Sequence, residues 1–371
     1  MKALEGIRVL DFTTLLPGPL ATLMLVDAGA EVIKVEQPGG EDLRKMKPFV
    51  KGNSLLFTLL NRGKKSLELN LKEEKNKKKL LKLVKNVDVI VEQFRPGVMR
   101  RLGIDWDTLR KINKKLVYCS ISGYGQTGEK KLVAGHDLNY LAESGLLSLS
   151  TSKNGEPILP NVQIADIAGG SYPAFMNIVL ALYKALRTKK GTYIDISMYE
   201  NLIPLAWLGL SYFYTKKKSP TPNSLHLNGG YHRYFIYETS DKRYLALGAL
   251  EDKFWLNFCE IIKAPESIIM ERGKTENLIK RIQKIIKSKD SNFWKKKFAA
   301  EKDVCCTFVE KIENLFRDTH INKKNLLRKR SNNKKNEFVK IPTVIGNKAD
   351  VHKNKQKVPL LAEHNYIINE Q

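Results

Sequence analysis

Two side chains able to carry a proton, His136 and Asp166, lie thirty positions apart, each on a short turn next to Gly or Ala and before a helical pattern. An imidazole and a carboxyl group that face one carbon from opposite sides can remove a proton on one side and return it on the other. Each residue also has a plainer interpretation. His136 can fill the turn before Asp137, and Asp166 can serve as the N-cap of the following helix. Local sequence alone favours these structural roles.

The first 122 residues alternate strand patterns with helical patterns, which is typical of a parallel sheet wrapped by helices. The expected strands are 6–12, 31–35, 65–71, 87–91 and 116–122, and the expected helices are 17–29, 72–85 and 97–112. In such sheets ligands bind outside the carboxyl ends of the strands, where residues 70–72, 93–95 and 123–128 are expected. Residues 16–19 (LPGP) stand where a G-x-G-x-x-G would be, which argues against nicotinamide dinucleotide binding.

The second half continues with an amphipathic helix at 174–187 and a strand at 193–198. Residues 201–214 are apolar nearly all round, so this segment is expected to be deeply buried or packed on another chain. After a Lys-, Ser- and Pro-rich linker the period changes to two, which predicts a hairpin about Asp241 and Lys242. Further helices are expected at 252–262, 276–288 and 291–299. Residues 321–357 have few apolar positions and are expected to be poorly ordered or to cross the surface.

The composition is strongly basic, with 64 Lys and Arg against 39 Asp and Glu and a net charge of +25. Clustered positive charge is the mark of nucleic-acid binding, but here it is spread over helical stretches such as 72–85 and no nucleic-acid motif is present. We therefore expect a solvated Lys-rich surface that attracts an anionic ligand, not a nucleic-acid partner. Four Cys predict neither a disulfide framework nor a metal site. The absence of a signal peptide and of a long apolar run predicts a soluble cytoplasmic protein without a membrane partner.

Several stretches in the right order resemble the class III CoA-transferase (CaiB/BaiF-type) superfamily, and within it the α-methylacyl-CoA racemase branch. They include GIRVLDFTTLLPGPLATLMLVDAGAEVIKVEQPGG, DVIVEQFRPGVMRRLG, ISGYGQTG, AGHDLNYLAESG, ADIAGG and NGGYHRYFIYETSDKRYLALGALEDKFW. The resemblance is continuous over about residues 1–260 and weak over 265–300 and 320–357. It implies an α/β fold with a Rossmann-like large domain, a smaller α+β domain and two chains that interlock as a homodimer. The implied division is 1–200, a linker helix at 201–224, the small domain at 225–320, and a segment at 321–371 that returns to the large domain.

The resemblance implies that His136 and Asp166 are the acid and base, and that Glu251, from the partner's small domain, hydrogen-bonds His136. Backbone N–H groups at a helix start, with Asp137 as N-cap, would stabilise an enolate, and Gly169 and Gly170 would let substrate approach the backbone. Family positions that contact coenzyme A correspond to Gln37, Leu69, Asn70, Leu71, Lys72, Gln93, Phe94, Arg95 and Arg101, and near the pantetheine to Gly135, Asp137, Asn139 and Tyr140. For any one Lys or Arg of so basic a chain, a solvated side chain is the alternative. The chain departs from the family at Gln37, where Arg is usual, at Asn228 for Asp, and at Phe308 for Pro.

Three hypotheses follow. The first is a racemase of 2-methyl-branched acyl-CoA thioesters that uses no metal or prosthetic group, with coenzyme A as part of the substrate. The second is a CoA transferase in which Asp166 is the nucleophile. His136, which transferases generally lack, and the GALED loop, which replaces their glycine-rich loop, favour the racemase. The third is a non-enzymatic basic binding protein, which salt-sensitive nucleic-acid affinity without coenzyme A binding would support.

Overall fold

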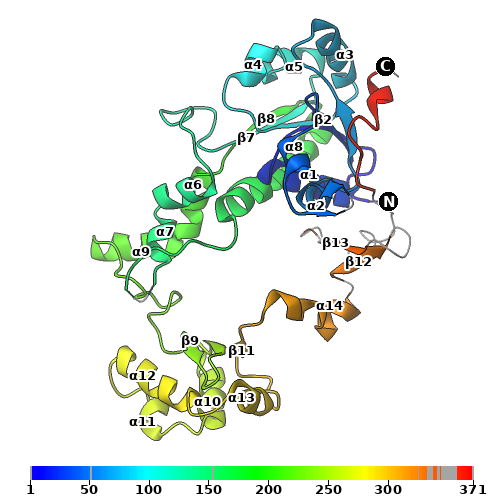
Figure 1. The fold of residues 1–371 in the computed structure, drawn as a ribbon. Helices are drawn as coiled ribbons and strands as arrows, with labels where there is room; N and C mark the ends of the chain where they lie inside the picture. Colours follow the sequence, from blue (N-terminus) through cyan, green and yellow to red (C-terminus); the bar gives the residue numbers. More distant parts are fainter. Residues whose placement is uncertain are drawn as a thin grey trace. The chain divides into compact units, whose positions relative to one another are not determined.

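The computed structural model describes residues 2–50, 52–152, 154–324, 326–331, 337–340, 343 and 357–369, and Figure 1 shows the elements. The chain forms two compact units. The first comprises Met1–Ser144, Pro160–Leu205 and Leu326–Gln371, and the second comprises Gly145–Leu159 and Ala206–Asn325. Residues 145–159 therefore belong to the second unit, although the sequence-based division assigned residues 1–200 to one domain.

A six-stranded parallel sheet forms the centre of the first unit. Its strands are β1 (Arg8–Phe12), β2 (Glu31–Glu36), β5 (Lys65–Glu68), β6 (Val89–Glu92), β7 (Val117–Ser122) and β8 (Thr192–Ser197). The strand order is β5-β2-β1-β6-β7-β8, and every pair is parallel. The order reverses between β1 and β6, as in doubly wound dinucleotide-type folds, where this switch point opens a crevice at the carboxyl edge. The predicted parallel α/β sheet is confirmed.

Helices cover both faces of this sheet (Figure 1). One face carries α1 (Pro17–Ala28) and α8 (Tyr172–Thr188), which also contact each other. The other carries α3 (Glu74–Val84), α4 (Val98–Leu102), α5 (Trp106–Ile112) and η5 (Asn365–Ile368). Fully buried strand residues such as Leu10 and Ile90 pack there with Leu80 of α3. Residues 357–369 thus return to the first unit, where the amide of His364 donates to the Ser66 carbonyl over 3.0 Å.

Two helix predictions need correction. The expected helix at 97–112 is two helices, because Gly103 ends α4 with a left-handed φ of 70° and the Asp105 side chain caps α5 through the Thr108 amide. The expected helix at 72–85 is confirmed in part as α3, whose buried residues are Leu80, Leu83 and Val84, and not Leu81 as its apolar pattern predicts. The sequence analysis did not predict η1 (Asp42–Lys45), the short strands β3 (Phe49–Val50) and β4 (Asn53–Ser54), or α2 (Leu55–Asn61). Most of residues 321–357 lie outside the described residues. Among those that the structure does describe, β12 (Arg328–Ser331) pairs with β13 (Glu337–Lys340).

The second unit is built on an antiparallel sheet of order β11-β10-β9, with strands β9 (Tyr234–Glu238), β10 (Tyr244–Gly248) and β11 (Cys306–Phe308). Glu238 pairs with Tyr244 in register, so the predicted hairpin about Asp241 and Lys242 is confirmed. The helices packed on the sheet are α10 (Asp252–Ile261), α11 (Glu266–Ile269), α12 (Thr275–Ile286) and α13 (Ser291–Phe298). Trp255 and Phe258 lie at the centre of their shared core.

The apolar segment 201–214 forms η3 (Glu200–Ala206) and the start of α9 (Trp207–Lys216). Its large apolar side chains are mostly exposed, Trp207 by 59% and Tyr214 by 72%, so the surrounding unit by itself does not bury them deeply. Packing on another chain stays a prediction. Within the described part of the chain, no helix combines the length and apolar character needed to span a membrane.

Candidate active site

Loops at the carboxyl edge of the sheet hold most of the residues expected to contact coenzyme A. Gln37 directly follows β2, residues 69–72 follow β5, and residues 93–95 follow β6. These loops already have internal support: the Gln93 side chain accepts the Gly18 amide of α1 over 2.9 Å, and Asn70 accepts the Lys72 amide over 3.1 Å. The expected position of these residues at strand ends is confirmed, while their contact with a ligand stays a prediction.

His136 is the N-cap residue of α6 (Asp137–Glu143) and is exposed. Its backbone N–H donates to the Asn139 side chain over 3.0 Å, which fixes the start of the helix. The expectation that Asp137 is the N-cap is wrong, because Asp137 is the first helical residue.

Tyr140 holds the segment before His136 in place. Its hydroxyl donates to the Gly135 carbonyl over 2.6 Å, and its ring packs edge-on against Tyr124. A Cβ on Gly123 would lie 2.4 Å from the Tyr140 hydroxyl, and one on Gly135 would lie 2.7 Å from its ring. Only glycine at both positions leaves room for this ring, so the ISG and AGH motifs form a slot that orients the turn carrying His136.

Asp166 lies in a π-helical turn, η2 (Ala165–Ser171), that leads into α8. π-Helical turns are frequent at functional sites because they displace side chains from the regular helical path. The Asp137 carboxylate accepts the Asp166 amide over 3.0 Å, which joins the start of α6 directly to η2. The local interpretation of Asp166 as an N-cap is wrong, since Ile164 precedes the turn. The structure therefore brings His136, Asp137 and Asp166 together.

The glycines after Asp166 have a packing role. A Cβ on Gly169 would lie 2.4 Å from the Met198 carbonyl oxygen, and one on Gly170 would lie 3.1 Å from Pro17. The Ser171 hydroxyl is fully buried and lies 2.7 Å from the Pro17 carbonyl and 3.1 Å from that of Asp166. Protein groups thus occupy the space that the sequence assigned to an approaching substrate, and they hold the turn against the loop after β1.

The electrostatics of the site favour proton transfer near neutral pH. Burial first, and the negative charge of Asp137 second, raise the pKa of Asp166 to about 6, while a charge on His136 acts in the opposite direction. A carboxyl group with this pKa can act as a base and, once protonated, as an acid at small energetic cost.

Buried charges position the loop between β1 and α1, and the sequence analysis missed them. The Lys64 ammonium lies 3.0 Å from the Asp11 carboxylate, and Lys34 lies 3.0 Å from Glu41. Although burial opposes it, the charges of Lys64 and Lys34 hold the pKa of Asp11 well below its usual range, whereas burial lowers the pKa of Lys64 to about 8. These buried charges could have been found from the sequence, because Asp11 and Lys34 each stand inside an otherwise apolar strand, VLDF and VIKV.

Glu92, at the end of β6, is a second missed group. It is buried, and its carboxylate accepts the Phe94 amide over 2.8 Å, which orders the loop expected to contact coenzyme A. Burial raises the pKa of Glu92 to about 7. Glu251, in contrast, lies in the second unit, where its backbone carbonyl accepts the Trp255 amide at the start of α10. Its expected contact with His136 stays a prediction.

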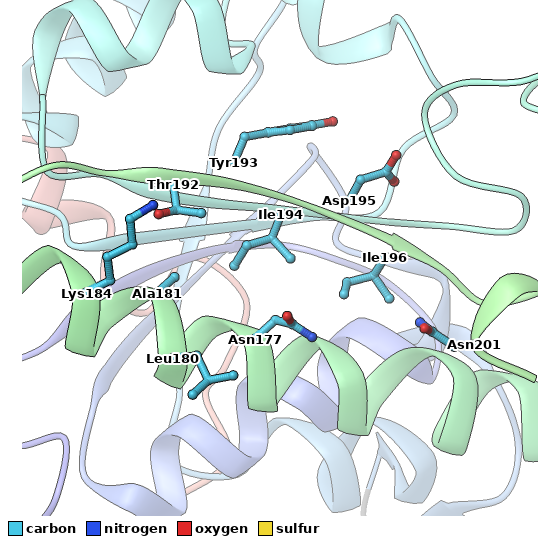
Figure 2. Close-up of a pocket in the computed structure, with 10 residues that line it drawn as sticks. All are labelled: Asn177, Leu180, Ala181, Lys184, Thr192, Tyr193, Ile194, Asp195, Ile196 and Asn201. Atoms are coloured by element: carbon cyan, nitrogen blue, oxygen red, sulfur yellow. The ribbon is translucent and has the colours of Figure 1, made fainter. Parts of the chain in front are cut away.

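A cavity of about 490 Å³ lies beside the edge strand β8 and α8 (Figure 2). Ile194 and Ile196 point from the strand toward the helix, while Tyr193 and Asp195 point to the opposite side (Figure 2). Neither His136 nor Asp166 lines this cavity, so it is separate from the candidate acid–base pair.

The doubly wound sheet, with an imidazole and a carboxyl group on joined turns, defines an α/β protein with a candidate acid–base site. Comparison with known proteins specifies the family. The family model for CoA-transferase family III matches residues 4–365, so the chain belongs to this family, as the sequence motifs indicated.

Its relatives include enzymes of two kinds. The chain is 36% identical over 281 residues to succinyl-CoA:glutarate CoA-transferase of Homo sapiens, which covers 75% of this chain and 63% of the relative. It is 37% identical over 258 residues to alpha-methylacyl-CoA racemase of Homo sapiens, which covers 68% of this chain and 63% of the relative. The chain thus spans less than two thirds of the length of these relatives.

Solved structures match over nearly the whole chain. Rv3272 from Mycobacterium tuberculosis has a TM-score of 0.84 and 27% identity, with 99% of each chain covered. A CAIB/BAIF family protein from Brucella suis has a TM-score of 0.83 and 25% identity, and covers 100% of this chain and 99% of its own.

Proposed function

We propose that the protein is a racemase or epimerase of 2-methyl-branched acyl-CoA thioesters that acts by proton transfer at the α-carbon. The observation that carries the proposal is the junction of α6 and η2, where the Asp137 carboxylate accepts the Asp166 amide directly beside His136. The pKa of Asp166, raised to about 6, supports a carboxyl group that both accepts and returns a proton.

The proposed reaction has two steps. The base removes the α-proton as the C–H bond breaks, and its electron pair delocalises onto the thioester oxygen as an enolate. The conjugate acid on the opposite face then protonates the carbon, which inverts it. His136 and Asp166 exchange these roles with the handedness of the substrate. Backbone N–H groups at the start of α6 would stabilise the enolate oxygen.

Coenzyme A, as part of the substrate, would lie along the carboxyl edge of the sheet. There Lys72, Arg95 and Arg101 offer positive charge for its phosphates, and Gln37 offers a neutral amide where the family usually has Arg. The +25 net charge favours capture of such an anion. No prosthetic group is required by this chemistry.

We further propose that the enzyme is a homodimer whose partner supplies Glu251 to His136. Supporting this, α8 exposes Met176, Leu180, Tyr183 and Leu186 by 60–65% each, and a single chain leaves this apolar row uncovered. Sedimentation analysis tests the proposal: the native chain should have the mass of two copies, and Leu180→Glu should shift it toward one. A native monomer at micromolar concentration would contradict it.

The alternative is CoA transfer, which the transferase relatives favour. In that reaction the Asp166 carboxylate attacks the thioester carbonyl, the C–S bond breaks and coenzyme A leaves as a thiolate, so that Asp166 and the acyl group form a mixed anhydride. The thiolate then attacks the Asp166 carbonyl, which releases the first acid and leaves an enzyme thioester. The carboxylate of the acceptor acid takes coenzyme A from this thioester by the reverse of these steps and frees Asp166. His136 has no required role in these steps.

Incubation with a (2R)-2-methylacyl-CoA in D2O, monitored at C2 by NMR, separates the two functions. The racemase requires deuterium incorporation at C2 without a second acid. His136→Gln and Asp166→Asn should each slow it by about 10²–10⁴-fold, the usual contribution of a general acid or base. The exposed residues His320 and Asp107 provide matched controls, as His320→Gln and Asp107→Asn. Transfer of coenzyme A to an added acid without deuterium incorporation would replace the racemase with the transferase.

A further inference from the structure

The loop that carries Glu251 is held on both sides by one side chain. Arg233 Nη1 donates to the Leu250 carbonyl over 3.1 Å and to the Asp252 carboxylate over 2.7 Å. These two residues are the immediate neighbours of Glu251, whose own side chain is exposed. A single guanidinium thus holds the backbone carbonyl of the residue before Glu251 and the side chain of the residue after it.

Arg233 is itself immobilised. Its side chain is only 8% exposed, its Nε donates to Glu271 Oε1 over 2.5 Å, and its guanidinium lies 5.1 Å from the centre of the Trp255 ring. A planar guanidinium can bond several acceptors in fixed directions and stack on an aromatic face, which an ammonium group cannot reproduce. The direction of its bonds to the loop is therefore set by Glu271 and Trp255.

Glu271 is built into the fold at a conformational cost. It follows α11 with a φ of 51°, in the left-handed region that favours glycine, and it accepts a hydrogen bond from His232 Nε2 over 2.8 Å. Burial lowers the pKa of His232, which favours the neutral ring that donates from Nε2. The Tyr237 hydroxyl in turn donates to the His232 carbonyl over 2.7 Å. A strained position filled by a carboxylate, and not by glycine, indicates that its contacts with Arg233 and His232 offset the strain.

We propose that Arg233 is a positioning residue: by holding the Leu250 carbonyl before Glu251 and the Asp252 carboxylate after it, Arg233 sets the direction in which the Glu251 carboxylate points. The role of Glu251 toward His136 rests on the proposed function. The clamp itself rests only on contacts within the second unit, formed by Arg233, Leu250, Asp252 and Glu271.

The first arm of the test measures the loop and needs no activity. Backbone order parameters of residues 250–252 in the full chain should fall from about 0.85 to below about 0.6 in Arg233→Met, a change from rigid to flexible backbone. Those of Tyr237 and Leu247 in the sheet should not change. Arg272→Ala, which removes an exposed arginine one residue after Glu271, is the matched control and should leave the loop rigid. Unchanged order parameters in Arg233→Met overturn the proposal.

Asp252→Asn provides a second variant if Arg233→Met folds poorly, because the Asp252 side chain is 86% exposed. It weakens one contact of the clamp and should lower the order parameter at residues 251 and 252 only. Arg233→Lys keeps the positive charge but not the planar guanidinium. The order parameters of residues 250–252 in this variant should lie between those of wild type and those of Arg233→Met. If Arg233→Lys has the same order parameters as wild type, the geometry of the guanidinium is irrelevant to the loop, and the proposal is overturned.

The second arm tests whether the clamp acts through Glu251. In the deuterium exchange assay, Arg233→Met should lower kcat by about tenfold with KM changed less than about twofold, because only a positioning contact is lost. In a Glu251→Gln background it should have no further effect, since residues acting through one another are not additive. If the two substitutions lower kcat additively, Arg233 does not act through Glu251, and that part of the proposal is overturned. Absence of exchange in the native enzyme would reject the proposed function, while the order parameters would still decide the clamp.

Discussion

Asp137→Asn should move the pH dependence of the exchange reaction without dismantling the site. The negative charge of Asp137 raises the pKa of Asp166, and its Oδ1 accepts the Asp166 amide. Asparagine retains an oxygen in this position but carries no charge, so the junction of α6 and η2 is preserved while its electrostatics change. Loss of the charge favours ionised Asp166, and the pKa of Asp166 must fall.

The size of the change follows from the causes of the raised pKa. The pKa of Asp166 rises from its usual 3.8 to about 6, and burial raises it more than the charge of Asp137 does. We therefore expect a fall of about 0.5–1 pH unit in Asp137→Asn. At pH 5 the ionised fraction of Asp166 would increase from about a tenth to between about a quarter and a half.

The assay is deuterium incorporation at C2 from pH 4.5 to 8, with the enantiomer whose α-proton faces Asp166. The acidic limb should move to lower pH, while the plateau rate falls, because a weaker base transfers protons more slowly. The variant and native profiles should therefore cross. An Asp107→Asn control should leave the profile unchanged. A uniform loss of rate with no movement of the limb, or a limb moved to higher pH, would refute the proposed coupling of Asp137 to Asp166.

Three further predictions concern the support of the site. Gly169→Ala places a Cβ 2.4 Å from the Met198 carbonyl, so η2 must shift, and the exchange rate should fall by about a hundredfold. Lys64→Ala leaves Asp11 without its close charge partner and should lower the free energy of unfolding by about 3–5 kcal/mol, measured by urea titration; an unchanged midpoint would contradict this. Asp166→Asn should raise the melting temperature more at pH 8 than at pH 5. The folded-state pKa of Asp166 is raised, so stability is lost as pH rises from its unfolded pKa through about 6, and a larger gain at pH 5 would contradict the raised pKa.

The strands could be predicted from the sequence because each is a short apolar run between turn residues. The prediction failed where a single backbone conformation decides the outcome. Gly103, at a φ of 70°, divides the expected helix at 97–112, and a periodic apolar pattern does not reveal such a break. The prediction for segment 201–214 stays open for a different reason. Its apolar character indicates that something covers it, but not whether that partner belongs to the same chain.

At the site, the motifs identified His136 and Asp166 but not how they are joined. The bond between the Asp137 carboxylate and the Asp166 amide spans 29 positions, and no local pattern encodes it. The pairing of Lys64 with Asp11 spans 53 positions and is equally invisible in the sequence. Such contacts depend on the sheet order, which places distant strands beside each other, and therefore only a structure reveals them.

The buried charges explain how loops at an open edge can be rigid. A loop that receives a ligand cannot be covered by apolar side chains on its outer side, so it must be held from within. Lys34 donates to the Thr13 carbonyl over 2.7 Å, at the start of the loop after β1, and Lys64 donates to the Pro19 carbonyl over 3.1 Å, in the first turn of α1.

Between these two anchors, the Pro17 carbonyl accepts the buried Ser171 hydroxyl of η2, the turn that carries Asp166. A buried ion pair adds little net stability compared with apolar packing, but a displaced partner would leave a charge unpaired, which strongly disfavours other loop positions. The buried charges of Lys34 and Lys64 thus anchor the segment on which the turn carrying Asp166 packs. Ion pairs that hold the loop after β1 therefore also help to fix the position of the Asp166 carboxyl group in η2.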